Sequence, residues 1–560
     1  MKRFRNIYKI GVAFGLLTTL SCTEQLIEMN KNPNGSDPSS ANPNMVLSTV
    51  LTEAGRAVVS LGYQDIAGLM QHTQKDGWGG GHNAYEWGGS NNEWSGYYGI
   101  LRNNQFVYDK AVELDQPLHQ AVTLIMKSFM FGMIADLWGD APYTDALKGA
   151  VGGLQYIYPA YDPQQKIYEG VLADLETANT LLSATSFNSA LGSADVFFNG
   201  NTARWRKFAN SLALRYYMRL AEKMPAVAKA GIEKIAGDPT RYPIITEVAD
   251  DVLLRFPGNS NADSWPSNAT YDTDSTNYRR IKMCDTFVRA LLEREDPRIG
   301  IWANKVQVFI QVRDDLPRGT DRIADTVVNG AARKVRYMSP DKLIPAGTPV
   351  ESINQHPEYV GLPIKLSVPY TYNQHTGGVQ SARNPHVSWV NSRFADAKSG
   401  IPARILTSAE VNFILAEAAA VYKWNTGDAE TRYKKAIQCS FESWGLGNAA
   451  ANYLNHPLVE FDGTQEQIIT QKWIASWSAA TEAWMDWRRT GYPELEGAAL
   501  ADVLPVRFYY PLSERNQNAD NVKAAVGRLE QTRFSALGED GAANSIWSKP
   551  WIVQGTTSPW

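Results

Sequence analysis

Amphipathic helical patterns dominate this chain of 560 residues. Apolar residues recur at three- and four-residue spacing, which places them on one face of an α-helix. The pattern predicts helices over 45–69, 120–137, 164–182, 203–224, 281–295, 408–422, 429–444 and 465–489, and short strands are expected in 306–312 and 335–338. Short turns between helices favour stacked helical hairpins, and any repeats are degenerate because no strict 34-residue period occurs. The predicted fold is mainly α.

Composition excludes several other classes of protein. Lys and Arg total 54, and Asp and Glu total 58, so the net charge of −4 does not favour a nucleic-acid partner. Three cysteines cannot supply a disulfide framework for a chain of this length. After residue 21 no apolar stretch is expected to reach bilayer length. The chain is therefore expected to bury a large globular core.

The first 22 residues are built like a signal peptide. Four cations precede an apolar run over 10–20, and the small residue Ser21 comes directly before Cys22. The four residues that end at Cys22 resemble a loose lipobox, which predicts that Cys22 is acylated and becomes the mature N-terminus. Several acyl chains on one cysteine would hold the protein stably at a membrane. The alternative is an ordinary secretory signal in which the cysteine is incidental.

This order predicts three parts of the chain. Residues 1–21 form a lipoprotein signal peptide. Residues 22–44 are rich in Asn, Pro, Ser and Gly, and are expected to form a flexible leader. Residues 45–560 form the helical body.

Three long segments of the body lack helical periodicity. They span 76–98, 257–278 and 367–394, and are rich in aromatic residues together with Gly, Asn or Ser. Loops of this length are usually functional or disordered, and disorder is disfavoured because Trp and Tyr side chains gain by packing. An exposed Trp offers a flat apolar face on which a sugar ring can stack. We expect the helical scaffold to bring these segments together as a binding region.

Candidate ligand-binding residues come from all three segments. The first segment is expected to contribute most, because its glycines cannot shield its several indole rings. The alternative is that the aromatic residues pin their own loops onto the helices. The candidates are Trp78, Tyr85, Trp87 and Trp94 in the first segment, Trp265 and Tyr271 in the second, and Tyr372, Arg383 and Trp389 in the third.

The sequence carries none of the common catalytic signatures. It has no nucleophile elbow, P-loop, zinc-protease helix, C-x-x-C pair or dinucleotide-binding glycine motif, and the seven histidines do not fall at metal-ligand spacing. We therefore predict no catalytic residues, no metal and no cofactor. A glycosidase needs only two carboxylates, so a secreted carbohydrate-active hydrolase is the alternative. Asp272 and Asp274 could offer oxygens to calcium, although the twelve-residue calcium loop is missing.

Two motifs are predicted to be structural. The stretch DLWGDAPYTDAL at 136–147 reads as a helix stop. In EAWMDWRRTGYP at 482–493, two tryptophans lie on a helix that ends at Gly491. Arg488 and Arg489 occupy its last turn, where cations favour the helix dipole. We expect these residues to belong to the scaffold.

Eight motifs follow the lipobox in order and cover nearly the whole chain. The motifs are NKNPNG at 30–35, DLWGDAPYTDAL at 136–147, YDPQQKIYEGVLADLETANTLL at 161–182, GNTARWRKFANSLALRYYMRLA at 200–221, EDPR at 295–298, ILTSAEVNFILAEAA at 405–419, EAWMDWRRTGYP at 482–493 and VRFYYPLSERNQN at 506–518. In this order they resemble the SusD/RagB family of nutrient-binding outer-membrane lipoproteins of Bacteroidetes, in its SusD-like 2 branch.

The resemblance implies an α-helical body of degenerate tetratricopeptide-like helix pairs with a loop-rich binding region packed on it. It also implies a non-catalytic lipoprotein of the outer membrane that faces the cell exterior. Such proteins capture an oligosaccharide, or in some members a peptide, and pass it to a SusC-like TonB-dependent transporter. The aromatic content favours a saccharide. Two features depart from the family: Thr19 replaces the usual Leu of the lipobox, and no dense acidic run follows Cys22.

The lipobox generates the first prediction. Mass spectrometry of membrane fractions should find Cys22 acylated, because the cation-rich, apolar and Ser-Cys order is what lipoprotein processing requires. An unmodified Cys22, or release of the protein in soluble form with Cys22 intact, would contradict it.

Overall fold

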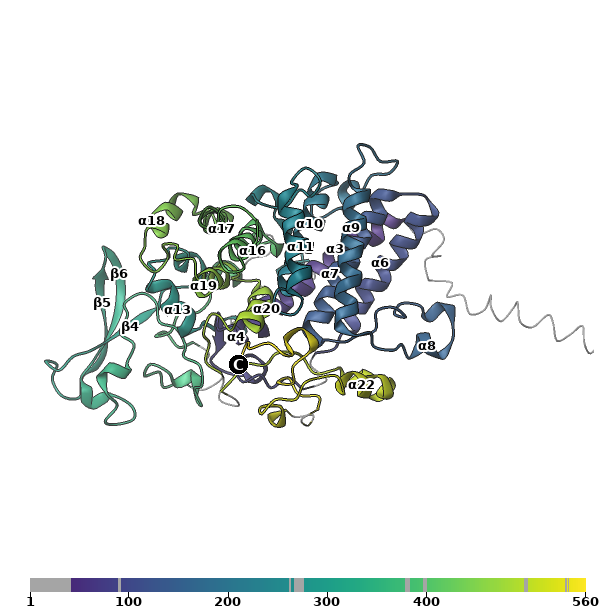
Figure 1. The fold of residues 1–560 in the computed structure, drawn as a ribbon. Coiled ribbons are helices and arrows are strands. Elements are labelled where there is room, and N and C mark those ends of the chain that lie inside the picture. The colour runs from purple at the N-terminus through teal and green to yellow at the C-terminus, as the bar shows by residue number, and fades with distance from the viewer. Residues whose placement is uncertain are drawn as a thin grey trace, which may run out of the picture.

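Helices carry most of the fold, as Figure 1 shows. The computed structural model describes residues 42–88, 92–260, 263–265, 276–377, 383–395, 400–497, 502–538, 541 and 543–560. The predicted signal peptide, Cys22 and nearly all of the predicted leader lie outside these residues. The prediction of a mainly α fold is confirmed.

One group of helices packs side by side around the long apolar helix α7. Helices α6 and α9 both pack on α7, α3 packs on α6, and α10 packs on α9 and α11. The group comprises α3 (Pro43–Tyr63), α6 (Ser95–Glu113), α7 (Pro117–Trp138), α9 (Gln164–Leu181), α10 (Thr202–Arg219) and α11 (Pro225–Gly237). Helix α7 ends at Gly139, whose φ of 98° suits only glycine. The predicted helix stop is confirmed.

A second group follows later in the chain, where α16 packs on α17 and on α19. It comprises α16 (Ser408–Ala420), α17 (Ala429–Ser443), α18 (Ala450–Leu454), α19 (Gln465–Ala475) and α20 (Ala480–Thr490). Three of these helices begin at a side chain that accepts a hydrogen bond from a backbone N–H of the first turn: Thr407, Asp428 and Thr464. Helix α20 ends at Gly491 in the left-handed conformation, as predicted.

The strands form three small sheets. The largest has the order β4-β6-β5 and projects from one end of the molecule (Figure 1). Strand β4 runs parallel to β6, and β5 antiparallel. The two other sheets pair β1 with β3 and β2 with β7, both antiparallel. The strands are β1 (Thr73–Lys75), β2 (Val252–Leu254), β3 (Ile281–Met283), β4 (Val308–Val312), β5 (Asp321–Val328), β6 (Ala331–Met338) and β7 (Ala403–Leu406).

Shorter helices decorate these elements. They are α4 (Asp65–Leu69), α5 (Gly80–Asn83), α8 (Leu154–Ile157), α12 (Thr276–Arg279), α13 (Asp285–Leu292), α14 (Ile299–Trp302), α15 (Ser392–Ala395), α21 (Leu512–Gln517) and α22 (Ala519–Val526).

Some predicted boundaries are wrong, and each has a physical reason. The predicted helix over 281–295 begins as β3 and turns helical only at Asp285, because residues 281–283 pair with β1. The predicted helix over 465–489 is two helices, α19 and α20, separated by a bend at 476–479. Helices α6 and α11 and strand β5 were not predicted. Strand β5 has no fully buried residue, and its sequence lacks a strong apolar alternation.

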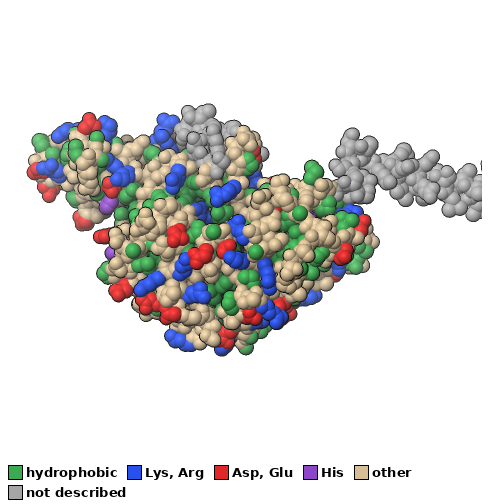
Figure 2. Space-filling model, turned by 90° about the horizontal axis from the view of Figure 1, so that it is seen from above, with side chains coloured by type: hydrophobic (Ala, Val, Ile, Leu, Met, Phe, Trp, Pro, Cys, Tyr) green, Lys and Arg blue, Asp and Glu red, His purple; other side chains and the backbone are tan. Residues whose placement is uncertain are grey.

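Two helical stretches of the described residues, Pro43–Leu69 and Pro117–Trp138, have the length and apolarity of a membrane span. The expectation that no stretch after residue 21 reaches that length is therefore wrong. Burial inside the protein accounts for the second stretch, since 94% of its most apolar window is covered by other elements. Over the face drawn in Figure 2, side chains of both charge signs are interspersed.

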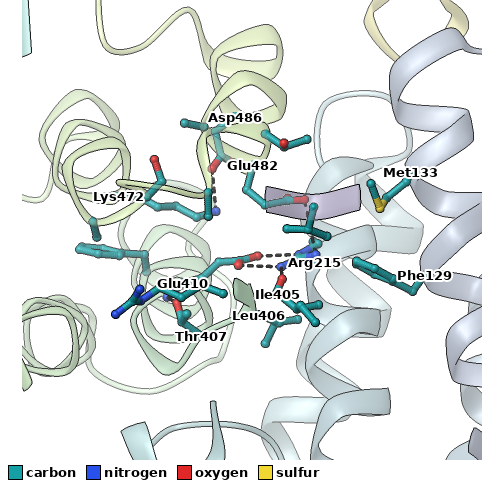
Figure 3. Close-up of a pocket in the computed structure, with 18 residues that line it drawn as sticks. Phe129, Met133, Arg215, Ile405, Leu406, Thr407, Glu410, Lys472, Glu482 and Asp486 are labelled. Carbon is teal, nitrogen blue, oxygen red and sulfur yellow. Dashed lines mark hydrogen bonds and ion pairs between the residues drawn. The ribbon is translucent and has the colours of Figure 1, made fainter. Parts of the chain in front are cut away.

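A network of buried ion pairs joins five helices of the two groups. Arg215 binds Glu410 through two hydrogen bonds of 2.7 and 2.8 Å and lies 3.4 Å from Glu482 (Figure 3). Lys472 lies 2.7 Å from Asp486. The network has five acidic and five basic members: Asp136 on α7, Arg215 and Arg219 on α10, Glu410 and Glu417 on α16, Lys472 on α19, and Glu482, Asp486, Arg488 and Arg489 on α20.

Arg489 makes the most enclosed contact of this network. Its Nη1 and Nη2 donate to the two carboxylate oxygens of Glu417 at 2.6 and 2.7 Å. The side chains of Arg489 and Glu417 are 4% and 0% exposed. Arg488, Trp484 and Trp487 are buried as well, which confirms that this motif belongs to the scaffold.

We expect Arg489→Met to lower the free energy of unfolding by about 3 to 5 kcal/mol, because the carboxylate of Glu417 is left buried without its partner. Urea unfolding followed by circular dichroism measures the change.

The matched control is Lys434→Met, which removes the exposed pair of Lys434 with Glu430 on α17 and should cost about 1 kcal/mol or less. If both variants lower the free energy of unfolding by the same amount, the buried pair stabilises the fold no more than the exposed pair does, and the prediction is wrong.

Candidate functional site

The three irregular segments meet at strand β3. Strand β1 pairs with one edge of β3, and the backbone N–H of Asp76 donates to the carbonyl of Arg280 at 3.0 Å. On the other edge Lys282 forms a bridge with Trp389. Tyr278, the last residue of the second segment, donates from its hydroxyl to the carbonyl of Val390 at 2.8 Å. Residues about 300 positions apart in the sequence thus lie on either side of one strand.

A buried ion pair fixes this junction. Nζ of Lys282 lies 3.2 Å from Oδ2 of Asp76, and both side chains are almost fully buried. Burial raises the pKa of Asp76 and lowers the pKa of Lys282, while the opposite charge of each partner counteracts both shifts. The pair therefore locks β1 to β3 directly before Trp78.

Trp78 presents its ring to solvent. Its side chain is 67% exposed, although it is the largest apolar side chain type in the protein. The guanidinium of Arg280 lies 4.0 Å from the ring centroid, and Arg280 itself is buried. One face of the indole therefore rests on a fixed cation, and the other face is open to a ligand. Trp78 has φ of 53°, an uncommon value for a residue with a side chain.

A cleft of about 530 Å³ opens beside Trp389. Aromatic and polar residues line it together. The lining residues are Tyr278, Arg279, Gly300, Ala303, Asn304, Lys305, Tyr359, Trp389, Asn391, Ser392 and Ala395. We call this the Trp389 cleft.

Trp389 is held firmly at the floor of this cleft. The guanidinium of Arg279 lies 5.0 Å from its ring centroid, and the ammonium of Lys282 lies 5.4 Å away. With the amide of Asn304 oriented to satisfy its neighbours, its oxygen accepts from the indole N–H of Trp389. Only 8% of Trp389 is exposed, so it offers an edge to the cleft and not a full ring face.

Four predicted site residues are core residues. Tyr85, Trp87, Trp94 and Trp265 are 0 to 3% exposed. Trp87 packs on Phe508 and Trp484, and its indole N–H donates to the carbonyl of Gly81 at 2.7 Å. The expectation that the glycines leave these rings uncovered is wrong. The loop folds back on the scaffold, and the rings gain more by packing than by facing water.

The remaining predicted residues are spread more widely. Tyr372 is half-buried against the small core beside β4 and β6, and Arg383 is exposed in the same segment. Tyr271, Asp272 and Asp274 lie outside the described residues.

Sequence reasoning missed Arg279, Arg280 and Asn304. The cationic run Arg-Arg-Ile-Lys at 279–282 could have indicated the first two. It was overlooked because a helix was expected over 281–295.

Comparison with protein families decides the identity. Residues 36–318 and 350–511 match a family model described as starch-binding and associating with the outer membrane. The match covers most of the chain. The chain belongs to the SusD-like family. The predicted resemblance is confirmed, and with it the association with the outer membrane that defines this binding family.

Solved structures share the fold of this SusD-like protein. A SusD homologue from Bacteroides fragilis has a TM-score of 0.67 at 22% identity, over 92% of this chain and 99% of that one. An outer-membrane protein from Bacteroides vulgatus, for which a nutrient-binding role has been suggested, has a TM-score of 0.68 at 24% identity, over 92% and 100%. A chitin-binding protein has a TM-score of 0.66 at 22% identity, over 91% and 99%. Among curated protein sequences none matches significantly.

These likenesses establish the tetratricopeptide-like helical scaffold that was predicted. The description of the family is that of a binding protein. The region around β3 is therefore the candidate ligand-binding site.

We expect Trp87→Ala, Trp94→Ala and Trp265→Ala each to lower the free energy of unfolding by about 3 to 5 kcal/mol, since each leaves a cavity in the core. Trp78→Ala should change it by only about 0.5 kcal/mol, because the ring is mostly exposed. Urea unfolding of the four variants tests the assignment, which is wrong if Trp78→Ala unfolds as readily as the others.

Proposed function

We propose that this SusD-like protein captures an oligosaccharide outside the cell and passes it to a SusC-like TonB-dependent transporter. Trp78 carries the proposal. It presents an open indole face three residues after β1, which a buried ion pair holds against β3, and the polar Trp389 cleft opens at the other edge of β3. Rigid aromatic platforms bind ligands with little loss of conformational entropy.

The Trp389 cleft supplies the polar groups that a saccharide needs. Arg279 and Lys305 can donate hydrogen bonds to hydroxyl groups, and the amides of Asn304 and Asn391 can donate and accept. Sugars combine apolar ring faces with many hydroxyls, so an open indole ring and a cleft lined by polar groups each match part of their surface. A peptide offers fewer hydroxyls, which makes it the second candidate.

The family and the sequence around Cys22 support the proposed anchoring and hand-off. An acylated Cys22 would hold the protein at the outer membrane. The chitin-binding and starch-binding descriptions of relatives support a saccharide ligand.

Trp78→Ala should weaken oligosaccharide binding by about 1 to 3 kcal/mol, because a large apolar contact is lost, which is about fivefold to 150-fold in Kd. Isothermal titration calorimetry against malto-oligosaccharides, chito-oligosaccharides and short peptides measures the change.

Tyr158→Ala is the matched control, since Tyr158 is an exposed aromatic residue next to α8, away from the site. Unchanged saccharide affinity in Trp78→Ala would refute the site. If the protein binds peptides and no saccharide, the ligand is a peptide and the proposed saccharide class is wrong. Reducing ends released from a bound oligosaccharide, at a rate that survives repurification, would favour the hydrolase.

A further inference from the structure

A second cleft, of about 910 Å³, lies next to the Trp389 cleft. It is lined by residues 248–255, by 400–404 and by the end of α17. Three arginines, Arg255, Arg393 and Arg404, line it together with Trp444. We call it the arginine cleft.

Arg404 forms the buried part of this cleft. It is 7% exposed, and its guanidinium lies 3.7 Å from the ring centroid of Trp444. It donates to the carbonyl of Ser443 at 3.2 Å, while its Nη1 has no hydrogen-bond partner among the described residues. Burial is the main cause that lowers the pKa of Arg404 to about 10; the charge of Asp251 opposes this shift, and the charges of Arg255 and Arg393 add to it. The three guanidinium groups are therefore close enough to repel one another.

Arg255 and Arg393 are both exposed. Within the described parts of the chain, neither forms an ion pair, although most of the buried arginines do. Two carboxylates line the cleft, and both are otherwise engaged. Asp251 is buried and accepts from the backbone N–H of Ser408 at 2.6 Å, and Glu442 accepts from Gln438 at 2.7 Å. Three arginines thus face two carboxylates, which leaves the cleft with a net positive charge.

The arginine cleft and the Trp389 cleft share one wall. Helix α15 carries Ser392 and Ala395 on the side of the Trp389 cleft and Arg393 on the side of the arginine cleft. An extended ligand in one cleft can therefore reach the other around a single helical turn.

We propose that the arginine cleft binds the acidic group of a saccharide, either the carboxylate of a uronic acid or a sulfate ester. Arg393 and Arg255 approach the anion from the rim. Arg404, stacked on Trp444, supplies a fixed positive charge at the floor. Guanidinium groups match planar carboxylates and sulfate oxygens through paired N–H donors. The saccharide class rests on the proposed function, whereas the anion site rests on the three arginines alone.

The test uses four probes: a tetragalacturonate, a sulfated heparin tetrasaccharide, neutral maltohexaose and a tetraglutamate peptide. The purified protein, Arg255→Gln, Arg393→Gln and the double variant are titrated with each probe by calorimetry at low and high NaCl. Each substitution should weaken binding of the acidic saccharide by about tenfold or more, as expected for a hydrogen bond to a charged group, and added salt should weaken it as well. Arg102→Gln on α6, an exposed arginine outside both clefts, is the control and should bind as the parent does.

The outcomes separate this inference from the proposed function. Failure of both acidic saccharides to bind, or binding that is indifferent to Arg255 and Arg393, overturns the inference. If the inference fails in this way but Trp78→Ala loses maltohexaose binding, the proposed function is still supported. Arginine-dependent binding of tetraglutamate that is tighter than that of either saccharide overturns the saccharide class.

Discussion

The buried ion pairs between the two helical groups are the constraint on which the rest of the structure depends. Ten charged side chains from five helices meet there, with equal numbers of acids and bases. Removing charges from water is costly, so such pairs add little net stability over apolar packing. If one helix were misplaced, however, a charged side chain would be buried without its partner. The network therefore specifies one arrangement of α7, α10, α16, α19 and α20.

That arrangement extends to the candidate binding site through α19. Lys472 belongs to the network, and the next residue, Trp473, donates from its indole to the carbonyl of Met70 at 2.9 Å. Nε2 of His72 lies 3.2 Å from the carbonyl of Trp473, and burial lowers the pKa of His72 to about 3, so it stays neutral at physiological pH. Strand β1 begins directly after His72. The position of Trp78 is thus connected to the centre of the scaffold by a short chain of buried contacts.

The two clefts differ in chemistry but share helix α15. One offers an aromatic floor and amides, and the other offers three arginines. The oligosaccharide that we propose as the ligand would therefore meet neutral polar groups and cationic groups at separate places. The three-stranded sheet projects beyond this region with its own small apolar cores and adds no residue to the arginine cleft.

The sequence by itself determined the helical scaffold and the family. Periodic apolar residues and caps such as Thr407 and Asp428 act locally, and local signals can be read without knowing what packs where. The exposure of an aromatic ring is decided by distant contacts, so the sequence could not separate Trp78 from Trp87, Trp94 and Trp265. Only the tertiary structure did, because the pairing of β1 with β3 brings Arg280 against Trp78, while Phe508, Trp138 and Tyr63 cover the other three. The arginine cleft was hidden for the same reason: Arg255, Arg393 and Arg404 become neighbours only when β2 pairs with β7 and α15 packs beside them.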